Sequence, residues 1–208
     1  MSHDTWAHRV IAPAVRPLAR TPVTPNQLTA VRLAFGIAAA GAFAAGGPVW
    51  PQAGSGLWLA SMLFDRADGI LARLTGKTSA WGHKFDLFAD FTSTTLVFAG
   101  IGIGLRGGTL GPWAPALGAV AGLSVAAIFA LVYRIQGLLP AGRSAVPSAA
   151  GFDADDVLFV VAPVAWLGWL QPFLVTAAVG APLAAALALA TLAQLRRAQR
   201  SNTVVGHE

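Results

Sequence analysis

The sequence predicts an all-α integral membrane protein with six transmembrane helices and an N-terminal amphipathic helix in the membrane interface. Two observations lead to this fold class. Hydrophobic residues make up 55% of the 208 residues and charged residues only 11%, whereas soluble domains carry about 25% charged residues and need them on their surface. The apolar residues also fall into six long runs, separated by joints such as Gly46-Gly47-Pro48 and Gly107-Gly108.

Residues 1–25 form the first segment, which is too polar to span a membrane. Its apolar positions recur at helical spacing: Trp6, Val10, Ala14 and Leu18. Basic residues lie between these positions, so we expect a helix that lies flat among the lipid headgroups. Pro13 and Pro17 are expected to break or kink this helix. A disordered basic tail is the alternative.

Residues 26–200 are expected to form a single transmembrane catalytic domain. A spanning helix needs ~20 mostly apolar residues. The predicted helices cover 27–45, 56–75, 81–105, 113–138, 156–170 and 172–195. The fifth of these runs is short for a span. Residues 201–208 are expected to be a flexible tail.

The basic residues predict how these helices are oriented. They cluster before the first helix, after the second, between the fourth and fifth, and after the sixth, whereas the opposite side has only Arg106. The positive-inside rule therefore places both termini in the cytoplasm. We interpret the net charge of +5 as membrane topology and expect no nucleic-acid partner. No removable signal peptide is predicted, and the bacterial inner membrane is the expected location.

Four aspartates occupy unusual positions for a membrane protein. Asp65, Asp68, Asp86 and Asp90 lie within 26 residues, in or next to predicted spans. A carboxylate there costs several kcal/mol unless it is paired or solvated, so it is functional by default. Helical spacing places the first two on one face and the last two on another. A short turn near residues 76–79 would bring the two faces together.

Converging carboxylates indicate a metal site. They cannot all be ionised at close range without cations, and Mg²⁺, Mn²⁺ and Ca²⁺ prefer oxygen ligands. The chain has no cysteine, which excludes zinc–thiolate sites, iron–sulfur clusters and disulfides. Small residues on the same faces leave room for a phosphate ligand, and Arg73 could contact that phosphate. The alternative is that the small residues only pack helices and the acids pair with nearby lysines and arginines.

The segment 65–90 carries a family resemblance. It reads DRADGILARLTGKTSAWGHKFDLFAD and matches without a gap D-x2-D-G-x2-A-R-x8-G-x3-D-x3-D, the signature of the CDP-alcohol phosphotransferases, also called CDP-alcohol phosphatidyltransferases. The run TPNQLTAVR at residues 24–32 resembles the family's entry into its first helix. Beyond residue 105 the resemblance covers only the general pattern.

The resemblance implies a transferase of phospholipid biosynthesis. Such an enzyme would transfer a substituted phosphate from a CDP-linked alcohol or CDP-diacylglycerol to an acceptor alcohol and release CMP. It implies two Mg²⁺ or Mn²⁺ ions, no organic cofactor, contact with membrane lipids, and a homodimer. The acceptor stays open among serine, glycerol phosphate, inositol phosphate, choline and diacylglycerol.

The resemblance also implies roles for individual residues. Asp65, Asp68 and Asp86 would hold metal, and Asp90 would act as the general base and could also touch metal. The positions matching the nucleotide site are Asn26, Asp68, Gly69, Ala72, Arg73 and Gly82. Helix capping is the plainer role for Asn26. Arg32, inside the first helix, is expected either to pair with a motif aspartate or to reach the headgroups.

Four residues outside the motif are candidates for binding the acceptor: Arg134, Arg143, Asp153 and Asp156. The plainer roles are interface anchoring for the two arginines and helix capping for the two aspartates. His83 is expected in a loop next to the site.

Two other functions stay open at the level of the sequence. A carboxylate-lined cation transporter would use the same aspartates, but it has no need of Gly69, Ala72, Arg73 and Gly82. A member that only binds nucleotide is the second, although the complete set of acids argues against it.

Overall fold

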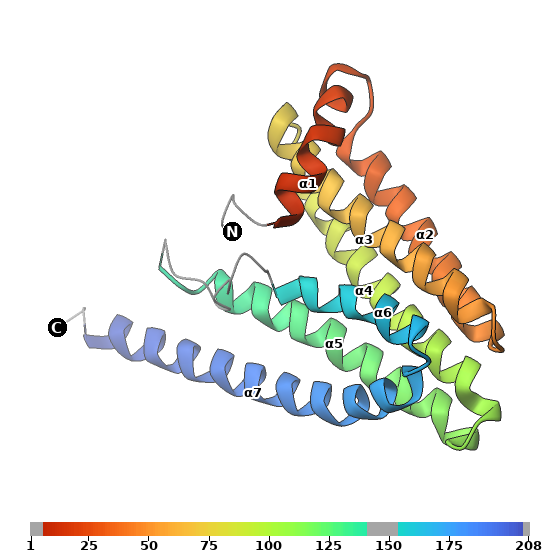
Figure 1. Cartoon of the computed structure of the whole chain (residues 1–208). Helices are drawn as coiled ribbons and strands as arrows, with labels where there is room; N and C mark the ends of the chain where they lie inside the picture. The colour runs from red at the N-terminus through yellow and green to blue at the C-terminus, as the bar shows by residue number, and fades with distance from the viewer. Residues whose placement is uncertain (1–5, 141–153, 206–208) are drawn as a thin grey trace.

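The computed structural model describes residues 6–140 and 154–205, and these are helical with short connections (Figure 1). The α-helices are α1 (Trp6–Val15), α2 (Pro25–Ala45), α3 (Trp50–Thr75), α4 (Ala80–Gly104), α5 (Ala114–Gln136), α6 (Val161–Trp166) and α7 (Leu170–Val205). Short 3-10 helices are η1 (Arg16–Arg20), η2 (Leu105–Gly107), η3 (Gly111–Trp113) and η4 (Ala154–Val160). Each of the six predicted spans overlaps one helical segment, so the all-helical prediction is confirmed for the described residues.

Four helices in the described part of the chain are long and apolar enough to cross a membrane: Pro25–Ala45, Ala80–Gly107, Gly111–Gln136 and Leu170–Gln199. The chain is thus a multi-pass membrane protein. Helix α3 has 26 residues but is not among the four, because its second half carries the motif acids and two arginines. The fifth predicted span is a 3-10 helix followed by a six-residue α6.

Capping residues explain where the helices around the aspartates begin and end. The hydroxyl of Thr24 accepts from the backbone N–H of Gln27 (3.4 Å), and the Gln27 side chain accepts from the N–H of Thr24 (2.9 Å). Gly76, with φ of 65°, ends α3 in the left-handed conformation. Ser79 then caps α4. The turn expected near residues 76–79 is therefore present.

Helix α2 packs against both α3 and α4, α4 packs against α5, and α5 against α7. Glycines allow these helices to touch through their backbones. A Cβ added to Gly100 of α4 would lie 2.3 Å from the carbonyl oxygen of Ala40 in α2. A Cβ on Gly102 would lie 2.4 Å from the carbonyl oxygen of Ala114 in α5. The helices can approach this closely because no side chains separate them.

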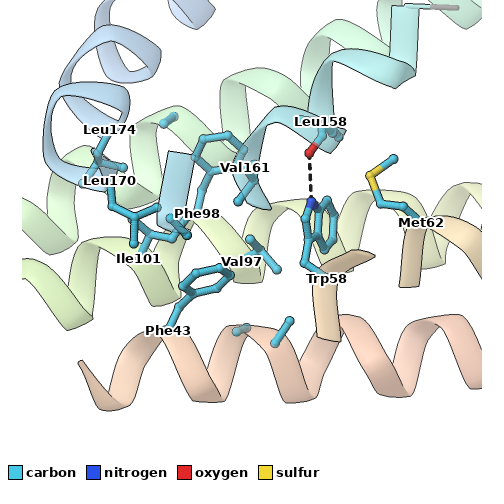
Figure 2. Packing of buried hydrophobic residues seen from close by; sticks show 14 of the residues in the cluster. Phe43, Trp58, Met62, Val97, Phe98, Ile101, Leu158, Val161, Leu170 and Leu174 are labelled. Atoms are coloured by element: carbon cyan, nitrogen blue, oxygen red, sulfur yellow. Dashed lines mark hydrogen bonds between the residues drawn. The ribbon is translucent and has the colours of Figure 1, made fainter. Parts of the chain in front are cut away.

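The main apolar core lies where helices α2 to α7 and the 3-10 helix η4 meet (Figure 2). Phe43 and Phe98 are fully buried in it. The indole N–H of Trp58 donates to the carbonyl oxygen of Leu158 at 3.0 Å. This bond joins α3 to η4 across the core, as the dashed line in Figure 2 shows.

The N-terminal helix α1 packs on the outside of α3 (Figure 1). Ile11 and Val15 are buried in a second cluster with residues of α2 and α3, whereas Val10 is exposed. The helix continues through Pro13 and changes to 3-10 geometry at Arg16, just before Pro17. Of the two prolines expected to interrupt the helix, only Pro17 lies where the α-helix ends.

Helix α7 runs beside α5 over much of its length (Figure 1). It continues to Val205, so helical backbone extends into the segment 201–208 that was expected to be a tail. Residues 206–208 lie outside the described part of the chain.

Candidate active site

The motif aspartates come from two helices that the turn at residues 76–79 joins. Asp65 and Asp68 lie in the second half of α3, and Asp86 and Asp90 lie in the first half of α4. One carboxylate oxygen each from Asp65, Asp68 and Asp86 lie within 4.8 Å of one another. Asp90 is one helical turn beyond Asp86 and is not a member of this group. The structure therefore groups three acids around one point and sets the fourth beside them.

A buried arginine of α2 links the acids of the two other helices. The guanidinium of Arg32 donates through Nη1 to Asp65 Oδ1 and, at 2.9 Å, to Asp90 Oδ1. Its Nη2 donates to the backbone carbonyl of Asp86 at 2.9 Å and lies 3.1 Å from Asp86 Oδ1. Of the two roles expected for Arg32, the structure has it paired with motif aspartates.

Asp68 has a different partner. The hydroxyl of Thr29 in α2 donates to Asp68 Oδ2 at 2.8 Å, and both side chains are buried. Thr29 is not among the site residues predicted from the sequence. The available signal was its position three residues before Arg32 in the run 24–32, which places both side chains on the same face of α2.

The exposure of the four carboxylates increases along the site. Asp68 is buried, with 6% of its surface exposed. The side chains of Asp65, Asp86 and Asp90 are 20%, 39% and 45% exposed. The site thus has a closed end at Asp68 and an open end at Asp90.

Two glycines of the predicted nucleotide face differ in their surroundings. A Cβ on Gly82 would lie 2.8 Å from Asn26 Oδ1, so the side chain of Asn26 rests directly on this glycine. A Cβ on Gly69 would meet only the guanidinium of Arg73, at 3.6 Å. Thr24 rather than Asn26 caps α2, so the capping role expected as an alternative for Asn26 is wrong.

The remaining nucleotide candidates lie on the same part of α3. Ala72 is half-buried and Arg73 is exposed in the last turn of the helix. Gly69, Ala72 and Arg73 thus all belong to α3, whereas Asn26 and Gly82 belong to the neighbouring helices α2 and α4.

The candidate acceptor residues are less completely described. Arg134 is exposed in the last turn of α5, next to Tyr133, whose ring lies 5.0 Å from the ring of His83 in α4. His83 is thus in the first turn of a helix and not in the expected loop. Asp156 belongs to η4, whereas Arg143 and Asp153 lie outside the described residues.

The donor set fits a hard divalent cation. Three carboxylates offer oxygen atoms to one point, which suits Mg²⁺ or Mn²⁺. The guanidinium of Arg32 already bonds to Asp65, one member of this group, so a positive charge is held there in this structure.

The fold of this chain is similar to that of solved membrane enzymes. Two crystal structures of Mycobacterium tuberculosis phosphatidylinositol phosphate synthase (PgsA1) share the fold. The one with CDP-DAG bound has a TM-score of 0.62 and 22% identity, covering 91% of this chain and 92% of that one. The one in complex with manganese and citrate has a TM-score of 0.61 and 21% identity, covering 90% and 87%.

A sequence search of curated proteins finds no match. The CDP-alcohol phosphatidyltransferase family, however, matches residues 22–192. This range contains α2 to α6, most of α7, and all four motif aspartates. The chain belongs to the CDP-alcohol phosphatidyltransferase family.

Proposed function

We propose that this protein is a metal-dependent membrane transferase of phospholipid biosynthesis. It would move a substituted phosphate from a CDP-linked alcohol or CDP-diacylglycerol to an acceptor alcohol and release CMP. The observation that carries the proposal is the convergence of Asp65, Asp68 and Asp86 within the family's motif. The related structures, which contain CDP-DAG in one case and manganese in the other, support both the donor and the metal. Family membership favours this activity over cation transport.

Asp65, Asp68 and Asp86 would hold Mg²⁺ or Mn²⁺, with two ions expected and Asp90 as a further ligand. Bound there, the ions would neutralise the pyrophosphate and make CMP a better leaving group. Thr29 would orient Asp68 through its hydrogen bond (2.8 Å), because outer-shell partners fix the direction of a ligand's oxygen atoms.

The nucleotide would lie along Gly69, Ala72 and Arg73 of α3. Over Gly69 lies only the end of the flexible Arg73 side chain, 3.6 Å from the position that a Cβ would take, so a ligand could approach the helix backbone, which a larger side chain would prevent. The exposed guanidinium of Arg73 could donate to a phosphate. Asn26, held against Gly82, would present its amide from the opposite side.

Asp90 would accept the proton of the acceptor hydroxyl. Its side chain is 45% exposed, the most open of the four acids, and Arg32 holds one of its oxygens. A carboxylate positioned beside the metal ligands can take a proton as the hydroxyl attacks phosphorus. Arg134, Arg143, Asp153 and Asp156 remain the candidates for binding the acceptor.

For the membrane, we propose six crossings, with α3 and the η4–α6 segment added to the four apolar helices. Exposed apolar residues of α7, such as Val179, Leu183 and Leu187, suit contact with lipid. The exposed Val10 of α1 suits an interfacial position for the N-terminal helix. Both termini and the site would face the cytoplasm of a bacterial inner membrane, and the enzyme would act as a homodimer.

The direct test is CMP release by the purified protein in lipid nanodiscs. Mg²⁺ or Mn²⁺ would be supplied with CDP-diacylglycerol or a water-soluble CDP-alcohol, each paired in turn with the five acceptor classes. We expect CMP with one pair and none after chelation by EDTA. A folded protein that forms no CMP with any pair would contradict the proposal. A lipid comparison of cells with and without the protein would then identify the product.

A further inference from the structure

We infer that Arg32 is a built-in counter-cation of the acidic site. It holds Asp65, Asp86 and Asp90 in place when divalent ions are absent, and it competes with those ions for Asp65 and Asp86. The inference rests on the metal site of the proposed function, and it adds a regulatory property to that site.

The positive charge of Arg32 is buried between helices. Arg32 is 2% exposed and lies within α2, which contains no acidic residue. A guanidinium inside a membrane helix is costly unless carboxylates surround it. The carboxylates come from α3 and α4, so the ion pairs of Arg32 tie three helices together. Without the guanidinium, the negative charges of these acids would lie close together with no arginine to neutralise them.

Arg32 shares two carboxylates with the metal group, those of Asp65 and of Asp86, whose Oδ1 lies 3.1 Å from Nη2. Asp65 bonds to Nη1 of Arg32 and also belongs to the three acids whose oxygens converge. A divalent ion at this point and the guanidinium would repel each other. Asp68 differs, because its hydrogen-bond partner is the neutral hydroxyl of Thr29. Only part of the metal group is therefore subject to competition.

The backbone around Arg32 is held in position, so Arg32 cannot easily move away from the acids. The carbonyl of Arg32 accepts a hydrogen bond from the Ser61 hydroxyl at 2.9 Å, and both residues are buried. One turn further along α2, Gly36 lies against Ser93 of α4 so closely that a Cβ would come within 2.5 Å of the Ser93 hydroxyl oxygen. The backbone of α2 is thus fixed relative to α3 and α4 at the height of the site.

The bonding of Arg32 is also incomplete. Its Nε is buried and has no hydrogen-bond partner among the described residues. A purely structural ion pair would be expected to satisfy every buried donor. When a divalent ion enters, Arg32 would give up the carboxylates of Asp65 and Asp86 and keep its bonds to the Asp86 carbonyl and to Asp90, both 2.9 Å long. It would then act as a positioning residue for Asp90.

The test is Mn²⁺ affinity without nucleotide, measured by electron paramagnetic resonance on purified protein. For Arg32→Gln we expect affinity to rise at least about tenfold, the effect of removing one competing charged hydrogen bond. The melting temperature should fall without Mn²⁺ and rise more steeply than that of the wild type as Mn²⁺ is added. Unchanged or weaker Mn²⁺ binding would overturn the inference.

Arg106→Gln is the matched control. The guanidinium of Arg106 donates to the backbone carbonyls of Ala44 and Ile103 at the other end of α2 and α4. Its removal also deletes one positive charge, but Mn²⁺ affinity should stay within twofold of the wild type. If Arg106→Gln raises the affinity as much as Arg32→Gln, the effect is one of net charge and the inference fails.

Arg32→Lys covers the case in which Arg32→Gln does not fold. Lysine keeps the charge but lacks the planar fork whose Nη1 reaches Asp65 and Asp90 and whose Nη2 reaches the Asp86 carbonyl, so it cannot reproduce this geometry. We expect a Mn²⁺ affinity above that of the wild type, and an unchanged or reduced affinity would count against the inference. If the wild-type protein releases CMP but Arg32→Gln shows no gain in Mn²⁺ affinity, only the role of Arg32 is refuted. If the wild-type protein releases no CMP but Arg32→Gln gains Mn²⁺ affinity, only the transferase is refuted.

Discussion

The two ends of the α2–α3–α4 group are held together by different forces. At one end, an acidic layer consists of Thr29, Arg32, Asp65, Asp68, Asp86 and Asp90, and charged hydrogen bonds connect its helices. At the other end, a glycine layer consists of Gly100 and Gly104 of α4 against the carbonyls of Ala40 and Phe43 in α2. In the glycine layer the backbones touch, whereas in the acidic layer polar side chains fill the space between them.

The difference shows how a membrane bundle can combine a rigid part with a reactive part. Close backbone contact leaves no room for a ligand, so the glycine layer can only hold α2 and α4 in register. The acidic layer depends on charges whose balance changes when a metal or substrate arrives. Four substitutions, from the largest expected effect to the smallest, test this contrast.

Asp90→Asn should have the largest effect, and it acts mainly on the reaction. The amide cannot accept the hydroxyl proton, so turnover should fall by roughly 10²–10⁴-fold. Binding of CDP in the presence of Mn²⁺ should largely persist, because Asp65, Asp68 and Asp86 still offer their oxygens to the metal. CMP release and the Mn²⁺-dependent thermal shift with CDP measure the two properties. Full turnover in this variant would exclude Asp90 as the base.

Thr29→Val tests the closed end of the acidic layer. Valine has nearly the same shape but cannot donate to Asp68 Oδ2, so Mn²⁺ affinity should fall by about 10–100-fold. Mn²⁺ titration followed by electron paramagnetic resonance measures the loss. Thr191→Val is the control, since that hydroxyl donates only within α7, to the Leu187 carbonyl. Equal affinities for Thr29→Val and wild type would remove Thr29 from the site.

Gly100→Ala tests the glycine layer. The new methyl group would lie 2.3 Å from the Ala40 carbonyl oxygen, and relieving such an overlap typically costs about 1–3 kcal/mol. The melting temperature should fall, while Mn²⁺ affinity changes little because the acids lie at the other end of the helices. Gly56→Ala is the control, since no atom lies within 4 Å of a Cβ added there. A large loss of Mn²⁺ affinity in Gly100→Ala would show that the two layers are coupled.

Trp58→Phe should have the smallest effect. It keeps an aromatic ring in the core but removes the hydrogen bond to the Leu158 carbonyl, a loss of about 1 kcal/mol. The melting temperature should decrease slightly and CMP release should be unchanged at low temperature. A loss of activity larger than the loss of stability would mean that the junction between α3 and η4 takes part in catalysis.

Much of the helical framework was predictable from local sequence. Apolar runs and capping signals such as Thr24, Gly76 and Ser79 locate the ends of helices, because capping depends on residues within one turn of each other. The fifth span was less predictable. In the structure residues 156–160 of this span are 3-10 helix and 161–166 are α-helix, and apolar content alone does not separate the two geometries.

The partners of Asn26 and Arg32 show where local reasoning ends. Asn26 stands near the start of a helix and resembles a cap, yet its side chain rests on Gly82 of α4. Arg32 was expected to pair with an acid or to reach the headgroups, and the sequence did not favour either. Both outcomes depend on which helix covers that face of α2.

The sequence by itself determined the family, the helical membrane class and the two helix faces that carry the four aspartates. Helical periodicity assigns residues to a face because positions three and four apart recur on one side. The tertiary structure alone decided that α2 covers both faces, and so places Thr29 on Asp68 and Arg32 among the other three acids. Periodicity carries no information about the neighbouring helix, which depends on how glycines and side chains of all the helices pack together.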